Sequence, residues 1–398
     1  IMITLSRKAA AIEPSVTLEI SAKAKAMKAE GKKIVAFTAG EPDFDTPVPI
    51  VEAAKKALDD GYTKYTPAAG LPELKRAICE KFLSDNGLSY EPEQIVVSDG
   101  AKSSLFHAIA AIAGEGDEVI VPSPYWVTYV EQIRLCGATP VIVETTEKSG
   151  YKLLKEQFEQ AVTEKTKCLI LNSPCNPTGA VYTREELSGI AEVCERRGVS
   201  VISDEIYEKL VFDGAKHVSI ASLSPYMKDN TIVINGVSKT YAMTGWRVGY
   251  LAAPTNVARA ISAMQGHTTS NACSFAQVAS VTALHTGETV PEHMREVFDK
   301  RRVLLLSLLA EIPQLGFIRP EGAFYVFVDI GGCIGKNFRG ERINGSVDFC
   351  NALLGAGVAA IPGAAFGRDD FIRLSYAVSE EDIREGVRLI AEFVGGLA

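Results

Sequence analysis

The chain has 398 residues, of which 47% are hydrophobic and 23% are charged, and its formal net charge at pH 7 is −8. This length and composition predict a globular protein of two or three domains with a large core. The acidic balance and the lack of a Lys/Arg cluster argue against nucleic acid or an anionic membrane surface as the main partner.

The eight cysteines are scattered along the chain, with no C-x-x-C pair and no histidine at metal-ligand spacing. This pattern predicts neither a metal site nor a disulfide framework, and reduced thiols are typical of cytoplasmic proteins. The first residues lack the apolar core of a signal peptide, and the longest apolar stretch, residues 303–309, is too short to span a bilayer. We therefore expect a cytoplasmic protein without a membrane segment.

Residues 1–14 show no clear periodicity, which predicts an N-terminal arm. A helical pattern follows at 21–30. Thr46-Pro47 is expected to open the next helix, as a capping residue followed by a first-turn proline. Residues 62–70, Y-T-K-Y-T-P-A-A-G, then form a loop rich in hydroxyl groups.

From residue 95 onward, short apolar runs alternate with helical patterns. One of these helices is bounded by the capping box Thr183-x-x-Glu186 and by Gly198. Apolar strands flanked by helices predict an α/β fold with a mostly parallel sheet covered on both faces. After a composition change near residues 286–291, a long helix at 293–309, further strand patterns and a helix opened by Ser379 predict a second, smaller α+β domain.

Lys239 follows the apolar strand pattern at 231–236. Partial desolvation there would lower the pKa of the lysine and free its amine to form a Schiff base, and the planar fork of Arg247 is suited to a phosphate. A solvated surface lysine is the alternative. A carbonyl cofactor that bears a phosphate would use both side chains.

Other polar residues also stand at strand ends, where ligands bind in such sheets. The segment Gly100-Ala101-Lys102 precedes a helix, so its free N–H groups favour an anion, although an ordinary strand–helix turn is the alternative. Asp204 ends a strand that we expect to be buried, and its carboxylate needs a partner such as a protonated pyridine nitrogen, unless it caps a helix. Tyr207 could reach a ring oxygen or be a half-buried aromatic residue, and Trp126 could stack on a flat ring or belong to the core.

Two nucleotide-binding patterns fail. Gly355, Gly357 and Ala360 match a dinucleotide fingerprint by letter, but they follow a helix and precede a strand, which is the wrong order. No Walker A sequence occurs. The sequence therefore argues against an NAD-dependent dehydrogenase.

Six motifs occur in order along the chain: A-G-E-P-D-F-D-T-P, K-Y-T-P-A-A-G, N-S-P-C-N-P-T-G, S-D-E-I-Y-E, S-K-T-Y-A-M-T-G-W-R-V-G-Y and R-L-S-Y-A. Together they resemble the class I pyridoxal-phosphate aminotransferases of fold type I, in the branch that contains bacterial aspartate and aspartate–prephenate aminotransferases. The resemblance covers roughly residues 13–395. It implies an arm at 1–14, a small domain at 15–46 and 291–398, and a large domain at 47–290 with a seven-stranded sheet.

The resemblance implies pyridoxal 5'-phosphate as the cofactor and assigns three catalytic residues. Lys239 would be the Schiff-base lysine and proton carrier, Asp204 the partner of the pyridine nitrogen, and Tyr207, with Asn176, a partner of the ring oxygen. Trp126 would stack on the ring. The residues around the phosphate would be Gly100, Ala101, Lys102, Ser238 and Arg247, with Tyr65 reaching in from the second subunit of a homodimer. Gly236 stands where some relatives have a phosphate-binding serine.

The resemblance also implies the small-molecule substrates. Arg373 would clamp the α-carboxylate, with Gly40, Asn176 and Trp126 beside it. Thr17 and Lys102 stand where relatives recognise a distal carboxylate, which implies aspartate, glutamate and their 2-oxo acids, with prephenate as a further acceptor. Lys102 could instead be only a neighbour of the phosphate. The alternative function is another fold type I enzyme: an aromatic, alanine or branched-chain aminotransferase, or a C–S lyase.

Overall fold

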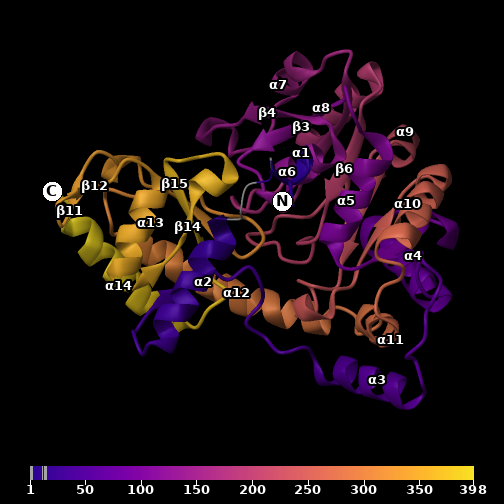
Figure 1. The fold of residues 1–398 in the computed structure, drawn as a ribbon, viewed down its shortest axis with the longest axis horizontal. Helices are drawn as coiled ribbons and strands as arrows, with labels where there is room; N and C mark the ends of the chain where they lie inside the picture. The colour runs from indigo at the N-terminus through magenta and orange to yellow at the C-terminus, as the bar shows by residue number, and fades with distance from the viewer. Residues whose placement is uncertain (1–2, 11, 13–15) are drawn as a thin grey trace.

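The computed structural model describes residues 3–10, 12 and 16–398. Its elements form two lobes, one built on a large sheet and one on a small sheet, and the long helix α12 (Thr289–Leu309) lies along both (Figure 1). Among the described residues, no helix is both long and apolar enough to cross a membrane.

Seven strands form the large sheet within the described residues, in the order β2-β8-β7-β6-β5-β3-β4. They are β2 (Ile95–Ser98), β3 (Glu118–Ser123), β4 (Thr139–Glu144), β5 (Thr166–Asn172), β6 (Ser200–Asp204), β7 (Thr231–Gly236) and β8 (Gly249–Ala252). Strand β8 is antiparallel to both of its neighbours, β2 and β7, and the remaining pairs are parallel. The predicted α/β fold with a mostly parallel sheet is therefore confirmed.

Both faces of this sheet are covered, because alternate side chains of each strand enter different cores. Ile170, Ile202 and Ile234 pack with α5 (Ala101–Ile112), α6 (Thr128–Cys136) and α10 (Thr255–Thr268). On the other face, Leu169 and Val201 pack with α8 (Arg184–Arg197), and Val233 packs with residues of α4 (Pro72–Asn86) and α11 (Ser274–Leu284). Further helices around this lobe are α3 (Val48–Asp59), α7 (Lys155–Ala161) and α9 (Pro225–Asp229).

The small lobe is built from segments of the N-terminal and the C-terminal parts of the chain. Its sheet has the order β14-β15-β10-β9, formed by β14 (Ile361–Pro362), β15 (Phe371–Ser375), β10 (Tyr325–Asp329) and β9 (Gly316–Phe317). Strand β1 (Val35–Ala36) pairs in parallel with β13 (Val358–Ala359), and β11 (Asn337–Phe338) pairs with β12 (Glu341–Arg342). Helices α2 (Val16–Ala29), α13 (Ser346–Gly355) and α14 (Glu380–Gly395) accompany these strands, and the short α1 (Arg7–Ala10) precedes them.

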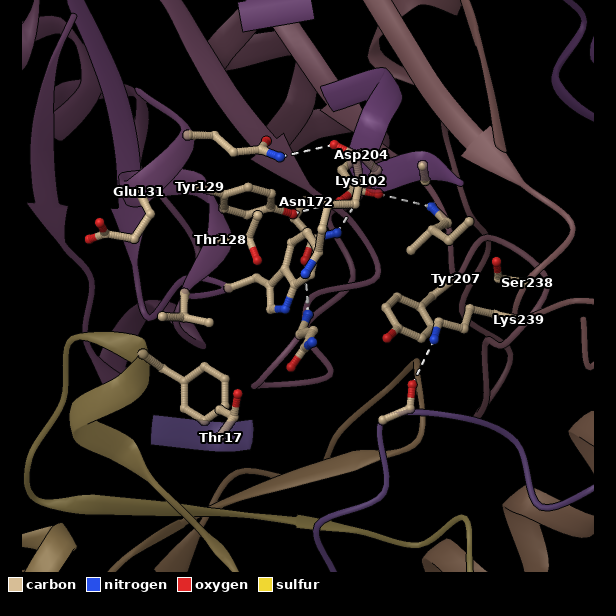
Figure 2. Close-up of a pocket in the computed structure, with 18 of the residues that line it drawn as sticks. Thr17, Lys102, Thr128, Tyr129, Glu131, Asn172, Asp204, Tyr207, Ser238 and Lys239 are labelled. Carbon is tan, nitrogen blue, oxygen red and sulfur yellow. Dashed lines mark hydrogen bonds between the residues drawn. The ribbon is translucent and has the colours of Figure 1, made fainter. Parts of the chain in front are cut away.

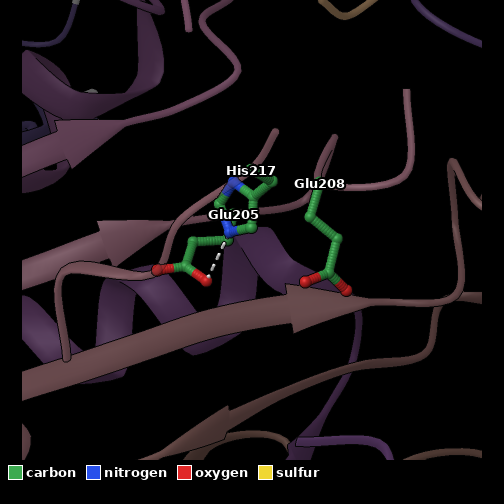
Figure 3. A group of neighbouring side chains, drawn as sticks. All are labelled: Glu205, Glu208 and His217. Carbon is green, nitrogen blue, oxygen red and sulfur yellow. Dashed lines mark hydrogen bonds and ion pairs between the residues drawn. The ribbon is translucent and has the colours of Figure 1, made fainter. Parts of the chain in front are cut away.

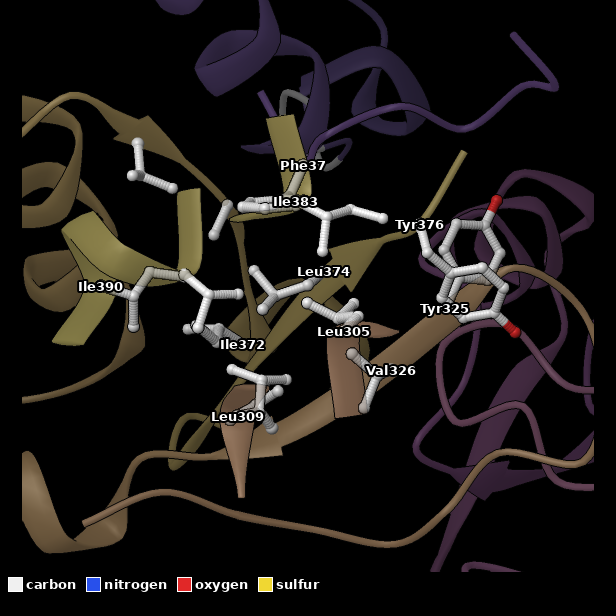
Figure 4. Packing of buried hydrophobic residues seen from close by; sticks show 14 of the residues in the cluster. Phe37, Leu305, Leu309, Tyr325, Val326, Ile372, Leu374, Tyr376, Ile383 and Ile390 are labelled. Carbon is white, nitrogen blue, oxygen red and sulfur yellow. The ribbon is translucent and has the colours of Figure 1, made fainter. Parts of the chain in front are cut away.

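The core of the small lobe contains side chains from both chain ends (Figure 4). Phe37 packs with residues of α12, β10, β15 and α14, among them Leu305, Val326, Leu374 and Ile383. All five of these side chains are fully buried. The N-terminal strand is thus held by apolar contacts with segments that lie more than two hundred residues later in the sequence.

Two helix starts differ from the sequence predictions. Pro47, not Thr46, is the residue before α3, and the Thr46 hydroxyl instead donates to the carbonyl of Ala242 at 2.6 Å. Helix α12 begins at Thr289 rather than 293, since Pro291 is tolerated in a first turn, where its missing N–H has no helical partner to lose.

The domain boundaries stay predictions. The boundary predicted between residues 14 and 15 lies outside the described residues. The boundary predicted between 290 and 291 falls inside α12, which starts at Thr289.

We expect Gly386→Ala to destabilise the protein, although alanine is the better helix former. A Cβ at Gly386 would collide with the ring of Phe37, and it would lie 2.9 Å from Cγ1 of Val35. Overpacking of this kind costs about 1–3 kcal/mol. The measurement is the free energy of unfolding in denaturant.

Gly395→Ala, in the same helix, is the matched control, because nothing lies within 4 Å of its Cβ position. This change should be neutral or stabilise by up to about 1 kcal/mol. Equal effects of the two substitutions would contradict the packing argument.

Candidate active site

A cavity of about 630 Å³ lies where the carboxyl ends of the large sheet meet the small lobe. Side chains from both lobes line it, and Figure 2 shows Asp204, Lys102 and Tyr129 on one side, with Thr17 of α2 on the far side. Of the predicted site residues, the lining includes Thr17, Gly40, Ala101, Lys102, Trp126, Asn176, Asp204, Tyr207, Ser238, Lys239, Arg247 and Arg373.

Lys239 reaches the cavity from the loop after β7. Its Nζ donates a hydrogen bond to the carbonyl oxygen of Gly40 at 2.6 Å, and the rings of Tyr207 and Phe324 have their centroids 5.9 Å away. Burial lowers the pKa of the lysine from 10.5 to about 8. At neutral pH the fraction of free amine is therefore on the order of 100-fold larger than for a solvated lysine.

Asp204 ends β6 with a buried carboxylate. Its Oδ2 accepts from the Tyr129 hydroxyl at 2.7 Å, and its Oδ1 accepts from the backbone N–H of Ile206 at 3.3 Å. Burial raises the pKa of this carboxyl to about 6, against the lowering effect of the two hydrogen bonds. A carboxylate in such a place favours a cationic partner, which a protonated ring nitrogen would be.

An anion seat surrounds the N-terminus of α5. Arg247 donates from Nη1 to the carbonyl of Thr244 at 2.8 Å, and its guanidinium lies so close to Gly100 that a Cβ there would collide with it. A Cβ on Gly249 would likewise collide with the Gly100–Ala101 backbone. Free N–H groups at a helix start, a cation and a backbone cleared of side chains form a site that fits a phosphate group.

Arg373, on β15, is buried in the same cavity. Its Nη1 donates to Oδ1 of Asn176 at 2.9 Å, and its guanidinium lies 4.2 Å from the ring centroid of Tyr325. Its buried Nε has no hydrogen-bond partner among the described residues. A buried guanidinium whose Nε–H has no acceptor is suited to binding a carboxylate ligand.

Lys102 contributes a further cation to this cavity from the first turn of α5. Its Nζ lies 4.9 Å from the centroid of the Trp126 ring, and its carbonyl accepts from Gln132 at 3.0 Å. Burial lowers the pKa of Lys102, and the neighbouring charge of Arg247 lowers it further. Thr17 also lines the cavity, so the two residues predicted to recognise a distal carboxylate face the same space.

Three predicted residues need separate comment. Tyr65 is 90% exposed and does not line the cavity of its own chain. Tyr207 is buried, and its hydroxyl hydrogen-bonds that of Tyr325 at 2.9 Å. Gly236 pairs with Gly249 across β7 and β8, and a Cβ there would lie 3.0 Å from the Cα of Gly249, so the strand pair leaves little room for a serine.

Tyr129, Asn172 and Tyr325 also contact residues of the site, and none of them is among the residues predicted from the sequence. Tyr129 binds the Asp204 carboxylate, and Asn172 donates from Nδ2 to the Asp204 carbonyl at 2.9 Å. Asn172 begins one of the quoted motifs and could have been found there, since it is the last residue of a predicted strand. Nothing in the sequence connects Tyr129 or Tyr325 with its partner, because the contacts come from tertiary packing.

Glu205, Glu208 and His217 lie close together behind the cavity wall, with ligand atoms within 4.8 Å of one another (Figure 3). Their carboxylate oxygens already have partners. Glu205 accepts from Ser203, Ser219 and His217, while Glu208 accepts from Lys81 and Asn86. The Lys81 ammonium supplies the positive charge that a metal ion would otherwise bring, so we assign this cluster a structural role.

Comparison with known families gives a match to the aminotransferases of class I and II over residues 32–390. The chain is 46% identical to the aspartate aminotransferase of Geobacillus stearothermophilus over 397 residues, which are 98% of each chain. It is 47% identical to the aspartate/prephenate aminotransferase of Cereibacter sphaeroides over 400 residues and the full length of both.

Solved structures agree with this. The aspartate aminotransferase from Rhizobium meliloti superimposes with a TM-score of 0.96 at 42% identity over all of both chains. The Thermus thermophilus aspartate aminotransferase with maleate gives a TM-score of 0.93 at 42% identity, over 98% of this chain and all of the other. The chain therefore belongs to the class I and II aminotransferases of fold type I, and its cofactor is pyridoxal 5'-phosphate.

Proposed function

We propose that this enzyme transfers an amino group between aspartate or glutamate and the 2-oxo acids oxaloacetate or 2-oxoglutarate. The observation that carries the proposal is that one cavity holds the amine of Lys239, the buried Arg373 and a second cation, Lys102. Two cations beside one reactive amine suit a substrate with two carboxylates. The name of the Thermus thermophilus relative, solved with the dicarboxylate maleate, supports the same substrate class.

The residues present fit the cofactor. Arg247, Ser238 and the start of α5 would hold its phosphate, Asp204 would hold the proton on its ring nitrogen, and Tyr207 with Asn176 would bind its ring oxygen. Trp126 would face the ring. When bound, pyridoxal phosphate supplies an aldehyde that condenses with amines and a protonated ring that withdraws electrons from the attached carbon.

The side chains of this chain then have distinct tasks. Arg373 binds the substrate α-carboxylate and fixes the Cα–H bond within reach of Lys239. As a free amine, Nζ of Lys239 would accept the proton of the Cα–H bond and later give it back. Its pKa near 8 suits this work, because a base with a pKa close to the working pH can both accept and release a proton. We expect ping-pong kinetics.

A second acceptor, prephenate, is favoured by one observation. Relatives at 47% identity over the whole chain are named aspartate/prephenate aminotransferases. Prephenate carries a distal carboxylate, so Thr17 and Lys102 would serve for both kinds of substrate.

The proposal is tested by mixing the purified, cofactor-loaded enzyme with single amino acids and following its visible absorbance. Aspartate and glutamate should abolish this absorbance and yield stoichiometric 2-oxo acid, and alanine and valine should do so far more slowly. Lys239→Ala should bind the cofactor yet lose turnover by several orders of magnitude, because it lacks the proton carrier. Absorbance that persists with every amino acid would rule out the aminotransferase proposal.

Lys102→Ala should separate the two roles considered for Lys102. If Lys102 binds the distal carboxylate, kcat/KM for aspartate falls about 10- to 100-fold, while that for alanine changes little. Lys167→Ala, which removes an exposed cation that does not line the cavity, should leave both values unchanged. Equal losses with aspartate and alanine would show that Lys102 acts only beside the phosphate.

We also propose that two chains form a homodimer in which Tyr65 reaches the partner's cavity. The segment that carries Tyr65 exposes large apolar side chains, with Tyr65 itself 90% exposed, Val48 71% and Leu58 45%. Exposed apolar groups concentrated on one segment are typical of an interface. Sedimentation should give twice the mass of one chain, and Tyr65→Phe should weaken cofactor binding. A fully active monomer would contradict this arrangement.

A further inference from the structure

Glu41 is a charged residue with no assigned role, and its neighbour in the chain, Gly40, lines the cavity. The Oε2 atom of Glu41 accepts a hydrogen bond from the hydroxyl of Thr244 at 2.7 Å. Thr244 lines the cavity, and its carbonyl accepts from Nη1 of Arg247 at 2.8 Å. Glu41 is thereby attached to the segment that carries the arginine of the anion seat.

Two further hydrogen bonds join the segment that contains Glu41 to the segment that contains Thr244. The Thr46 hydroxyl donates to the carbonyl of Ala242 at 2.6 Å, and the indole nitrogen of Trp246 donates to the Thr46 oxygen at 2.9 Å. Three side-chain hydrogen bonds thus hold residues 40–46 against residues 242–247. The carbonyl of Gly40 accepts from Nζ of Lys239 at 2.6 Å, so the residue directly before Glu41 is in contact with the reactive amine.

The charged groups around Lys239 come from four separate elements. Two are carboxylates, Asp204 at the end of β6 and Glu41 in the segment 40–46. The other two are arginines, Arg247 after the turn at Thr244–Trp246 and Arg373 on β15. The neutral groups that face the amine are the rings of Tyr207 and Phe324 and the Gly40 carbonyl. Two cations therefore stand against two carboxylates.

The two carboxylates are not equivalent. Asp204 is buried, already accepts from Tyr129 and Ile206, and would serve the ring nitrogen of the cofactor. Glu41 is exposed, and its described side-chain hydrogen bond leads to a hydroxyl, which does not neutralise its charge. Glu41 is the carboxylate that remains to oppose the two arginines.

We propose that Glu41 is a positioning residue for Lys239: its carboxylate, fixed by Thr244, balances Arg247 and Arg373 and so stabilises the ammonium form of the lysine. The proposal rests on the role of Lys239 in binding the cofactor. Burial lowers the pKa of Lys239 to about 8. Of the two carboxylates that raise this pKa, Glu41 has the larger effect. Loss of the Glu41 charge should therefore lower the pKa further, and the free amine should appear at lower pH.

The test uses the apoenzyme, without an amino acid substrate. The rate at which it takes up pyridoxal phosphate is followed by visible absorbance from about pH 6 to pH 10. Uptake requires the free amine, so the wild-type rate should rise with a midpoint near pH 8. Glu41→Gln keeps an acceptor for Thr244 but removes the charge, and its midpoint should lie about half a pH unit lower, as expected of a partly exposed charge. Glu41→Lys should move it about twice as far.

Asp43→Asn is the matched control, since Asp43 lies on the same segment but pairs with Arg301 at 2.7 Å. Its midpoint should equal that of the wild type. An unchanged midpoint in Glu41→Gln would overturn the proposal, because the charge of Glu41 would then have no effect on Lys239. An equal shift in Asp43→Asn would also overturn it, because the effect would then not be specific to position 41. Since the assay contains no aspartate, an enzyme with a different amino acid substrate would fail the turnover test and still pass this one.

Discussion

The burial of the Asp204 carboxylate is the constraint around which the cavity is built. A carboxylate removed from water is costly unless hydrogen-bond donors and a cation compensate for the loss. The hydrogen bonds to the carboxylate come from separate elements, the Tyr129 hydroxyl of α6 and the backbone N–H of Ile206 in the turn after β6. Asn172, opposite Asp204 in the register of β5 and β6, donates to the backbone carbonyl of Asp204 and so holds the strand end. The parallel arrangement brings these groups to one edge of the sheet. The remaining requirement is a positive partner, a part that the proposed function gives to the protonated ring of the cofactor.

The cavity also contains more positive than negative charge. Four cations line it, Lys102, Lys239, Arg247 and Arg373. Among the described residues of the lining, the carboxylates are Asp204 and Glu131, and the charge of Glu131 is paired with Arg134. An excess of cations in a low-dielectric site is unfavourable without counter-charges. In the proposed function, the phosphate of the cofactor and the carboxylates of the substrate would supply these counter-charges, and ligand binding would then neutralise the cavity. Burial is the main cause of the lowered pKa of Lys102 and Lys239, and the neighbouring arginines lower both pKa values further.

Much of this could be predicted from the sequence, and the limits have physical causes. The apolar runs at β5, β6 and β7 are buried on both faces, so their sequence pattern predicts strands of a covered sheet. The polar residues at the ends of these runs indicate one side of the cavity. Tyr129 and Tyr325 could not be predicted, because tertiary packing brings each hydroxyl to its partner: within the large lobe for Tyr129, and between the two lobes for Tyr325. Thr46 illustrates a different limit. It has the features of a helix cap, but its hydroxyl bonds Ala242, nearly two hundred residues away, since tertiary contacts override a local preference.

The pairing of β1 with β13 has a consequence for the synthesis of the chain. Val35 forms its ladder with Val358, and Phe37 is buried against segments that end near the C-terminus. During translation the segment with β1 is made first, and its partner β13 follows more than three hundred residues later. The large sheet, whose strands lie between residues 95 and 252, can form while the first strand still has no partner. The small lobe can therefore be completed only once β13, β15 and α14 have been made, and the cavity, which Gly40 and Arg373 both line, is complete only then.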